Sequence, residues 1–109
     1  MFVQLATDLA VTQGTNQFSP SVALGGLNSI RHSVTIVNLN GATNLATTLE
    51  GSNDNAFWES IGSALTMTTV STQSLENKNI TFAYVRLKYA VSGAGITVIC
   101  SSNLYGSVQ

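Results

Sequence analysis

Residues 79–91 read NITFAYVRLKYAV and show a period of two: the odd positions from Ala83 onwards are apolar or aromatic, whereas the even positions change from apolar and aromatic residues up to Tyr84 to the charged Arg86 and Lys88. Side chains change sides at every residue only in an extended strand, so this period predicts a β-strand with one buried face. Arg86 and Lys88 lie on the opposite, solvent-facing side. A strand of this kind requires a sheet that covers a core. The apolar face comprises Ala83, Val85, Leu87, Tyr89 and Val91.

The rest of the chain indicates the same structural class. Thr, Val and Ile are abundant, and turn-forming residues recur at short intervals, which is typical of many short strands. At 109 residues the chain is expected to form a single domain, residues 1–109. We predict an all-β fold, a two-sheet antiparallel sandwich of jelly-roll or Greek-key type, with a closed barrel as the alternative. The expected strands are residues 2–12, 30–39, 44–51, 56–61, 65–72, 79–91 and 95–103.

Glycine-containing turns suggest how these strands connect. Asn40-Gly41 favours a type I′ turn and predicts a hairpin between strands 30–39 and 44–51. Ser92-Gly93-Ala94-Gly95 predicts a C-terminal hairpin between strands 79–91 and 95–103. The segment 13–29 contains the only proline, and we expect it to be a long connection that crosses from one sheet to the other.

Charge is scarce in this chain. Four Lys and Arg residues and five Asp and Glu residues make up 8% of the sequence, with a net charge of −1. Nucleic acids and anionic membranes are bound by clustered basic residues, so neither is an expected partner. The first residues lack the pattern of a signal peptide, and no apolar run is long enough for a membrane span, so we expect a soluble chain. An uncharged polar surface favours permanent contact with neighbours, although a monomer remains the alternative.

Residues suited to catalysis are few and scattered. Cys100 lies in the run ITVIC, where we expect a buried, inert thiol. His32 alternates with Val34 and Ile36, which indicates a hydrogen-bonded strand residue. A single His and a single Cys cannot make a zinc site. The expectation is therefore no enzyme, no metal and no cofactor, with Arg86 and Lys88 pairing across strands with Glu50, Glu59 or Glu76.

Residues 49–62, LEGSNDNAFWESIG, allow three interpretations. The side-chain oxygens of this segment could hold a metal, or the only tryptophan could be the platform of a sugar site. The third interpretation is a structural corner, in which Asn and Asp close a turn and Phe57 or Trp58 anchors the next strand in the core. We favour this one. The corner comprises Asn53, Asp54, Asn55, Phe57 and Trp58.

The same segment, followed at 84–89 by YVRLKY and by a glycine-rich turn, resembles a recurring segment of small β-sandwich proteins. These include discoidin-like modules and small phage virion proteins, in which (L/I)EGSNDG-x-x-W precedes Y-(V/I)-R-(L/V). The likeness covers residues 45–100, with Asn55 in place of the usual glycine. The variable apolar and basic loops of the discoidin sugar binders are absent. The resemblance therefore points most closely to phage head decoration (cement) proteins.

This resemblance implies a non-enzymatic structural virion protein, a decoration subunit that stabilises the head shell. Its expected partners are itself, as a trimer by analogy with cement proteins, and a major capsid or other virion protein. Its expected location is the virion, assembled in the host cytoplasm. The alternatives are a carbohydrate- or receptor-binding module centred on Trp58, and another small head or tail structural protein.

Assembly is expected to use the ends of the chain, because the edges of a sandwich invite pairing and few charges guard them here. We predict that residues 1–12 or 103–109 contact a neighbouring subunit. Deleting residues 1–6 would then weaken assembly and leave the sandwich folded. The expected assembly contacts are Phe2, Val3, Leu5, Leu104 and Tyr105.

Overall fold

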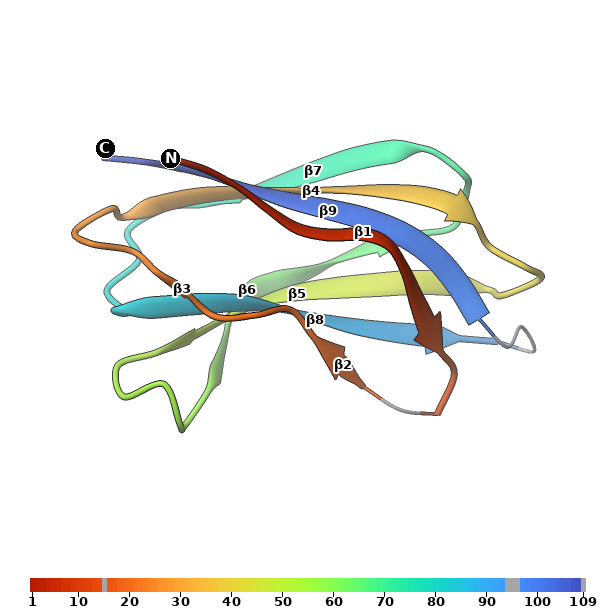
Figure 1. Cartoon of the computed structure of the whole chain (residues 1–109), viewed down its shortest axis with the longest axis horizontal. Coiled ribbons are helices and arrows are strands. Elements are labelled where there is room, and N and C mark those ends of the chain that lie inside the picture. Colours follow the sequence, from red (N-terminus) through yellow and green to blue (C-terminus); the bar gives the residue numbers. More distant parts are fainter. Residues whose placement is uncertain (15, 94–96, 109) are drawn as a thin grey trace.

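The computed structural model of the chain describes residues 1–14, 16–93 and 97–108. Within these residues the chain forms strands and turns, arranged as two layers (Figure 1). No helix of the described part is long and apolar enough to cross a membrane. The strands are β1 (Phe2–Thr12), β2 (Gln17–Phe18), β3 (Val22–Ala23), β4 (Ser29–Asn38), β5 (Asn44–Ser52), β6 (Glu59–Met67), β7 (Thr72–Asn77), β8 (Tyr84–Ser92) and β9 (Thr97–Ser107).

All strand pairs are antiparallel. The first sheet has the order β1-β9-β4-β7, and the second has the order β2-β8-β5-β6, with β3 also pairing with β8. The two sheets lie face to face, and the core fills the space between them (Figure 1). The predicted all-β antiparallel sandwich is therefore confirmed.

The side chains of β8 alternate between the buried and the outer face of the sheet, as predicted. Val85, Leu87, Tyr89 and Val91 are buried, whereas Arg86 and Lys88 lie on the outer face. The buried face packs against the inward side chains of the opposite sheet, which alternate in the same way along β4 and β9. Tyr89 links the layers, because its hydroxyl is 2.6 Å from Ser102 Oγ on β9. Residues from both sheets thus form one core.

Both predicted hairpins are wrong, although one of the turns forms. Asn40 and Gly41 have positive φ angles of 52° and 83°, and the Ala42 N–H donates to the Leu39 carbonyl at 3.0 Å. The turn nevertheless joins β4 of the first sheet to β5 of the second. Likewise, β8 and β9 belong to different sheets, and residues 94–96 of the predicted C-terminal turn lie outside the described residues. A turn signal sets the local reversal but not the sheet to which the next strand adds.

In the described residues, β5 and β6 are the only consecutive strands that pair with each other. The predicted strands 56–61 and 65–72 are replaced by one strand, β6, followed by β7 in the opposite sheet. Gly62, with φ of 67°, accommodates a register shift within the β5–β6 ladder. This irregularity keeps β6 continuous where the sequence suggested a break.

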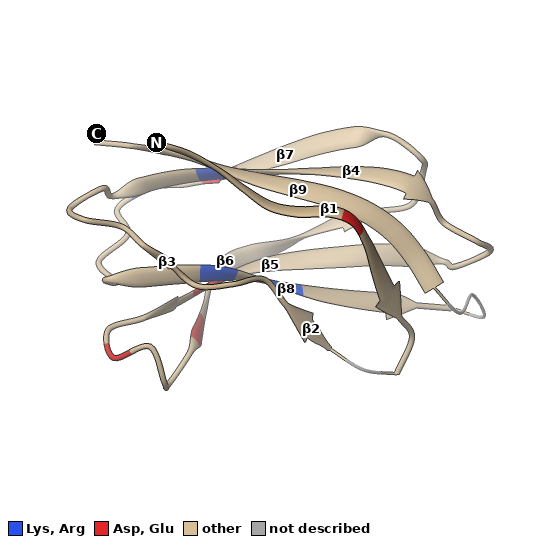
Figure 2. Cartoon of the chain, in the orientation of Figure 1, with Lys and Arg blue, Asp and Glu red and all other residues tan. Residues whose placement is uncertain are grey.

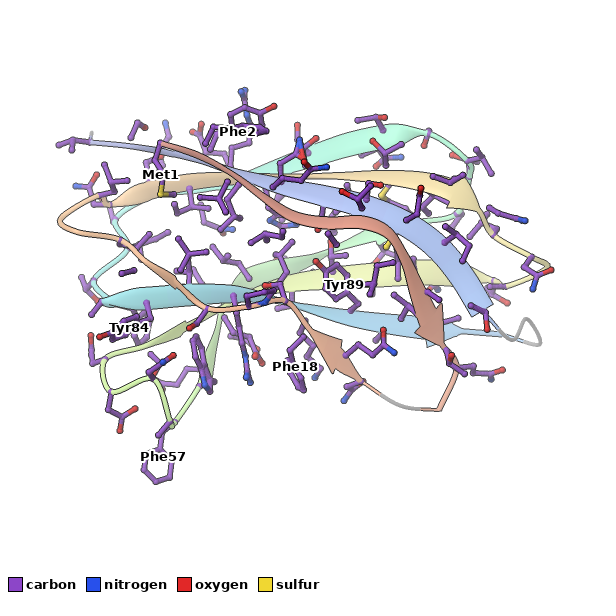
Figure 3. The ribbon with its side chains drawn as sticks, in the orientation of Figure 1. Met1, Phe2, Phe18, Phe57, Tyr84 and Tyr89 are labelled. Carbon is purple, nitrogen blue, oxygen red and sulfur yellow. The ribbon has the colours of Figure 1, made fainter. Side chains whose placement is uncertain are left out.

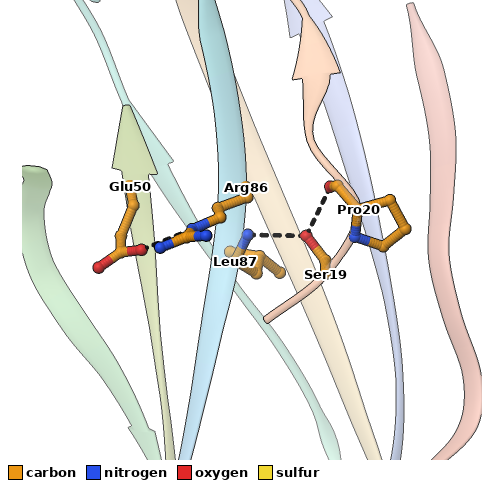
Figure 4. A network of polar contacts seen from close by, with 5 residues as sticks. All are labelled: Ser19, Pro20, Glu50, Arg86 and Leu87. Carbon is orange, nitrogen blue, oxygen red and sulfur yellow. Dashed lines mark hydrogen bonds and ion pairs between the residues drawn. The ribbon is translucent and has the colours of Figure 1, made fainter. Parts of the chain in front are cut away.

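The predicted crossing of residues 13–29 from one sheet to the other is only partly correct, because the connection reaches the second sheet but then returns to the first, which contains both β1 and β4. On the way it adds β2 and β3 to the edge of β8. Ser19 secures this crossing: its N–H donates to the Leu87 carbonyl, and its Oγ accepts from the Leu87 N–H at 2.9 Å and donates to the Pro20 carbonyl (Figure 4). A side-chain oxygen thus takes the place of a backbone acceptor beside a proline.

The ends of the chain hold each other. β1 runs along β9, with Phe2 opposite Tyr105, and the Met1 amino group donates to the Gly106 carbonyl at 3.0 Å (Figure 1). Their order therefore requires no neighbouring subunit. Edge strand β1 also carries a bulge at Asp8, whose φ is 48°. Such a bulge hinders pairing with another chain, so this edge is better guarded than the sequence suggested.

Candidate functional site

The segment 53–58 forms the loop of the β5–β6 hairpin. Asp54 Oδ1 accepts hydrogen bonds from Ser52 Oγ and from the N–H groups of Ala56 and Phe57, each at 2.9 Å. The backbone hydrogen bonds, that from Phe57 first, lower the pKa of Asp54. Asn55 takes the left-handed conformation with φ of 61°. The carboxylate of Asp54 therefore serves the turn itself, as an Asx-type brace.

Two further contacts fix this loop to the second sheet. Asn53 Oδ1 accepts a hydrogen bond from the Ala83 N–H at 3.0 Å. Gly51 lies directly under the ring of Phe82, where a Cβ would overlap the ring atoms. Glycine at this position allows Phe82 to pack over β5, so the loop and the segment before β8 form one rigid unit.

The expectation that Phe57 or Trp58 anchors the core is wrong. Phe57 is 82% exposed and points away from the body of the protein at the loop tip (Figure 3). Trp58 is half-buried but is not part of the core, which at this end is formed by residues such as Leu49. The reason is that β6 begins only at Glu59, so both aromatic residues belong to the loop.

Trp58 instead lies on the outer face of the second sheet, in a cluster that we term the Arg86 stack (Phe18, Glu50, Trp58 and Arg86). The Arg86 guanidinium lies 3.9 Å from the ring centroid of Phe18 and 4.2 Å from that of Trp58. Arg86 Nε donates to Glu50 Oε1 at 2.8 Å (Figure 4). The predicted cross-strand pairing of Arg86 thus forms with Glu50. Two aromatic faces and a carboxylate hold this guanidinium in place.

Phe18 was missed by sequence reasoning because it lies within the predicted connection. An aromatic residue in the otherwise polar stretch 16–21 was the available signal. β2 places it opposite Lys88, on the outer face of the sheet.

A cavity of about 290 Å³ lies beside the exposed phenylalanine. The rings of Phe57 and Phe82 and two carboxylate side chains border this cavity. Acidic residues are drawn in red in Figure 2. The lining residues are Asn53, Asp54, Phe57, Glu59 and Phe82. Among the described residues, no group of three or more His, Cys, Asp or Glu side chains is arranged to hold a metal ion.

A second surface lies on the outer face of the first sheet, next to the paired ends. The Arg31 guanidinium is 5.1 Å from the ring centroid of Tyr105, and the Phe2 ring packs on the same tyrosine at a centroid distance of 5.0 Å. A cavity of about 230 Å³ opens here. The lining residues are Ser29, Arg31, Glu76, Tyr105, Gly106 and Ser107.

The five predicted assembly contacts divide into two groups. Leu5 and Leu104 are buried in the core and cannot contact a neighbour, so the prediction is wrong for these two. Val3 is half-buried and packs against the core. Phe2 and Tyr105 are exposed, with 58% and 38% of their surfaces accessible, and their contact with another subunit stays a prediction. Alternation along β1 and β9 explains the division, because neighbouring residues face opposite sides.

His32 and Cys100 both lie in the core and are not brought together. His32 of β4 lies opposite Leu104 of β9, whereas Cys100 of β9 lies opposite Ile36 of β4. Burial raises the pKa of the Cys100 thiol to about 11 and lowers that of His32 to about 4. His32 Nε2 is 3.2 Å from Thr47 Oγ1, which confirms the predicted hydrogen-bonded strand residue. Neither group is available for nucleophilic or acid–base chemistry near neutral pH.

No family model and no curated protein matches this chain. Solved structures do share its fold. The SPBc2 prophage-derived protein YomS is 9% identical, with a TM-score of 0.58 over 96% of this chain and 92% of that one. A chain of infectious bursal disease virus, Gx strain, is 12% identical, with a TM-score of 0.61 over 99% of this chain but only 31% of its own length.

A third similar structure is chitosan-binding module 1 of a chitosanase/glucanase from Paenibacillus sp. IK-5. It is 21% identical, with a TM-score of 0.56 over 89% of this chain and 74% of the module. At these identities the likeness concerns the fold alone.

Proposed function

We propose that this protein is a non-enzymatic structural component of a virus particle, a decoration subunit that attaches to the head shell. The observation that carries the proposal is the exposure of Phe57 on a loop braced by Asp54 and Asn53. A large apolar side chain that is rigidly presented to solvent is suited to burial against a neighbouring subunit in a larger assembly.

Other features support this proposal. Charged residues make up only 8% of the chain, so the polar surface can be buried against neighbours without desolvating many ions. The titratable core residues His32 and Cys100 are buried and separate, which agrees with a non-enzymatic role. The fold is shared with a prophage-derived protein and with a chain of infectious bursal disease virus. The proposed location is therefore the virion, following assembly in the host cytoplasm.

The proposal predicts saturable attachment to shells. Purified protein is mixed with head shells of the encoding virus that lack it, and co-sedimentation and shell disassembly temperature are measured. A decoration subunit should bind at a fixed ratio to the shell protein and raise the disassembly temperature, because binding to the intact shell shifts the equilibrium toward it. Absence of saturable binding to the shells would reject the proposal.

The cavity beside Phe57 favours a second candidate, a carbohydrate-binding module. Two aromatic rings with the carboxylates of Asp54 and Glu59 suit a sugar that carries an ammonium group. Because Trp58 is the only tryptophan and adjoins this loop, its fluorescence should change saturably when glucosamine oligosaccharides are added. Uncharged xylan oligosaccharides are the control. Unchanged emission with both sugars, together with no retention on chitosan, would exclude this candidate.

A further inference from the structure

We propose that copies of this chain associate head to tail, with Phe57 and Glu59 of one copy entering the Arg31–Tyr105 cavity of the next. This inference rests on the proposed structural function, and it names one partner as a second copy of the chain. The loop 53–58, which carries Phe57, is here termed the knob; Glu59, the first residue of β6, lies beside it, and the 230 Å³ cavity is termed the hole.

The knob is built to be inserted. Phe57 is the most exposed large apolar side chain of the described residues, at 82%. The hydrogen bonds of Asp54 and the contact between Asn53 and Ala83 hold the loop in one conformation. Little conformational entropy is then lost on binding, which favours the use of this side chain as an anchor.

The hole has the size to receive this side chain, and the ring of Tyr105 gives its mainly polar lining one apolar wall. Its volume of about 230 Å³ exceeds the ~150 Å³ of an apolar protein cavity known to accept benzene. The ring of Tyr105 and the backbone at Gly106 provide flat surfaces for a phenyl ring. The exposed Phe2, which packs on Tyr105, extends the apolar surface at the mouth of the hole.

Charge complementarity selects the second copy as the occupant. In the described part of the chain, Arg31 forms no ion pair, although Glu76 lies opposite it on β7 and lines the same hole; the carboxylate of Glu76 pairs instead with Lys78 at 3.5 Å. Glu59, beside the knob, likewise has no cationic partner among the described residues. Insertion of Phe57 would bring a free carboxylate to a free guanidinium.

The positions of knob and hole determine the kind of assembly. The knob projects from the second sheet and the hole lies on the outer face of the first, so the two features are on opposite faces of the sandwich (Figures 1 and 3). A contact between unlike surfaces is heterologous and produces closed rings, including trimers, or open filaments. It requires no pairing of strand edges.

Two variants test this geometry. Phe57→Ala with Glu59→Gln removes the knob, and Arg31→Glu disables the hole. Each variant alone should be monomeric in analytical ultracentrifugation, with association at least about 30-fold weaker than in the parent chain. An equimolar mixture should form dimers and nothing larger, because one intact knob meets one intact hole. Val70→Ala, which truncates another exposed apolar residue, is the matched control and should assemble like the parent chain.

The inference is overturned if the parent chain stays monomeric at high concentration, if the knob variant assembles normally, or if the mixture forms no dimers. Circular dichroism confirms that each variant is folded. Attachment of the monomeric parent chain to head shells would then leave the proposed function intact, whereas loss of both self-association and attachment would reject the two together.

Discussion

At the scale of single residues, His32 is the buried group whose protonation matters most to the fold. It lies on β4 with no exposed surface, and its Nε2 lies within hydrogen-bond distance of Thr47 Oγ1. Thr47 in turn donates to the Leu65 carbonyl at 3.5 Å, so its oxygen accepts from the Nε2–H. Nδ1 then carries no proton, and it has no partner among the described residues. The site therefore suits the neutral imidazole and disfavours the cation.

Stability should consequently fall in mild acid. Burial lowers the pKa of His32 from 6.5 to about 4, so between these values the unfolded chain binds a proton that the folded chain does not. The free energy of unfolding should be highest above pH 6.5 and should decrease by up to about 3 kcal/mol as the pH falls to 4. Urea unfolding at pH 7 and pH 4.5 measures the difference.

The control for this experiment is His32→Gln, which keeps a hydrogen-bonding group but removes the titration. Its stability should be nearly constant between pH 7 and 4.5. The hydrogen-bonded carboxylate of Asp54 loses its stabilising charge only below the ordinary value of 3.8, outside this range. An equally steep decrease in the variant would show that another group is responsible.

At the scale of elements, β1 is an integral part of the first sheet. It pairs with β9 from Phe2 to Thr12, and it contributes Leu5 and Val11 to the core. The sequence predicted a strand at residues 2–12 whose first six residues could be deleted without unfolding the sandwich, whereas the structure shows that these residues pair with β9. The same strand carries the guarding bulge at Asp8.

Deleting residues 1–6 should therefore destabilise the sandwich itself. The deletion removes the buried Leu5 and the pairing of Phe2 with Tyr105, so we expect a loss of about 3 kcal/mol or more in the free energy of unfolding. Phe2→Ser keeps the backbone pairing and should change stability much less. Chemical denaturation of both variants measures the contrast, and a truncated chain as stable as the parent would show that β1 is dispensable.

A feature could be predicted from the sequence where it depends on neighbouring residues, and could not where it depends on residues far apart in the chain. Alternation is local and strong, so β1 and the buried face of β8 could be predicted from sequence. Sheet membership depends on distant pairing, and for this reason the turn at Asn40-Gly41 was predicted but its hairpin was not. Phe57 and Trp58 were assigned to the core on hydrophobicity, whereas the start of β6 at Glu59 placed them in a loop. The Arg86 stack joins residues from β2, β5, β8 and a loop, and only its Arg86–Glu50 pair had a sequence signal.

At the scale of the whole molecule, stability comes from packing between the sheets, with little from charge. The described residues form two ion pairs, Lys78–Glu76 and Arg86–Glu50, and the first is well exposed. Charged residues are few in both layers (Figure 2). The core between the sheets is a single apolar cluster.

Salt should therefore affect folding and association differently. Raising NaCl from 20 mM to 500 mM should change the free energy of unfolding by less than about 1 kcal/mol, because the exposed Lys78–Glu76 pair contributes little and the largely buried Arg86–Glu50 pair is screened only weakly. The proposed contact between Arg31 and Glu59 should weaken over the same range, because it is screened. Thermal unfolding and sedimentation in the same buffers separate the two effects. A large decrease in melting temperature with salt would mean that the ion pairs stabilise the fold more than their number suggests.

The placement of β9 has a consequence for biosynthesis. β9 follows every other described strand in the sequence, yet it lies between β1 and β4 and joins them into one sheet. During translation β1 therefore has no partner in the first sheet until β9 leaves the ribosome, whereas β4 can pair only with β7. Tyr105 and Gly106, which line the hole, belong to this same strand. A nascent chain thus has no complete docking surface, which would delay polymerisation until each newly made copy has folded.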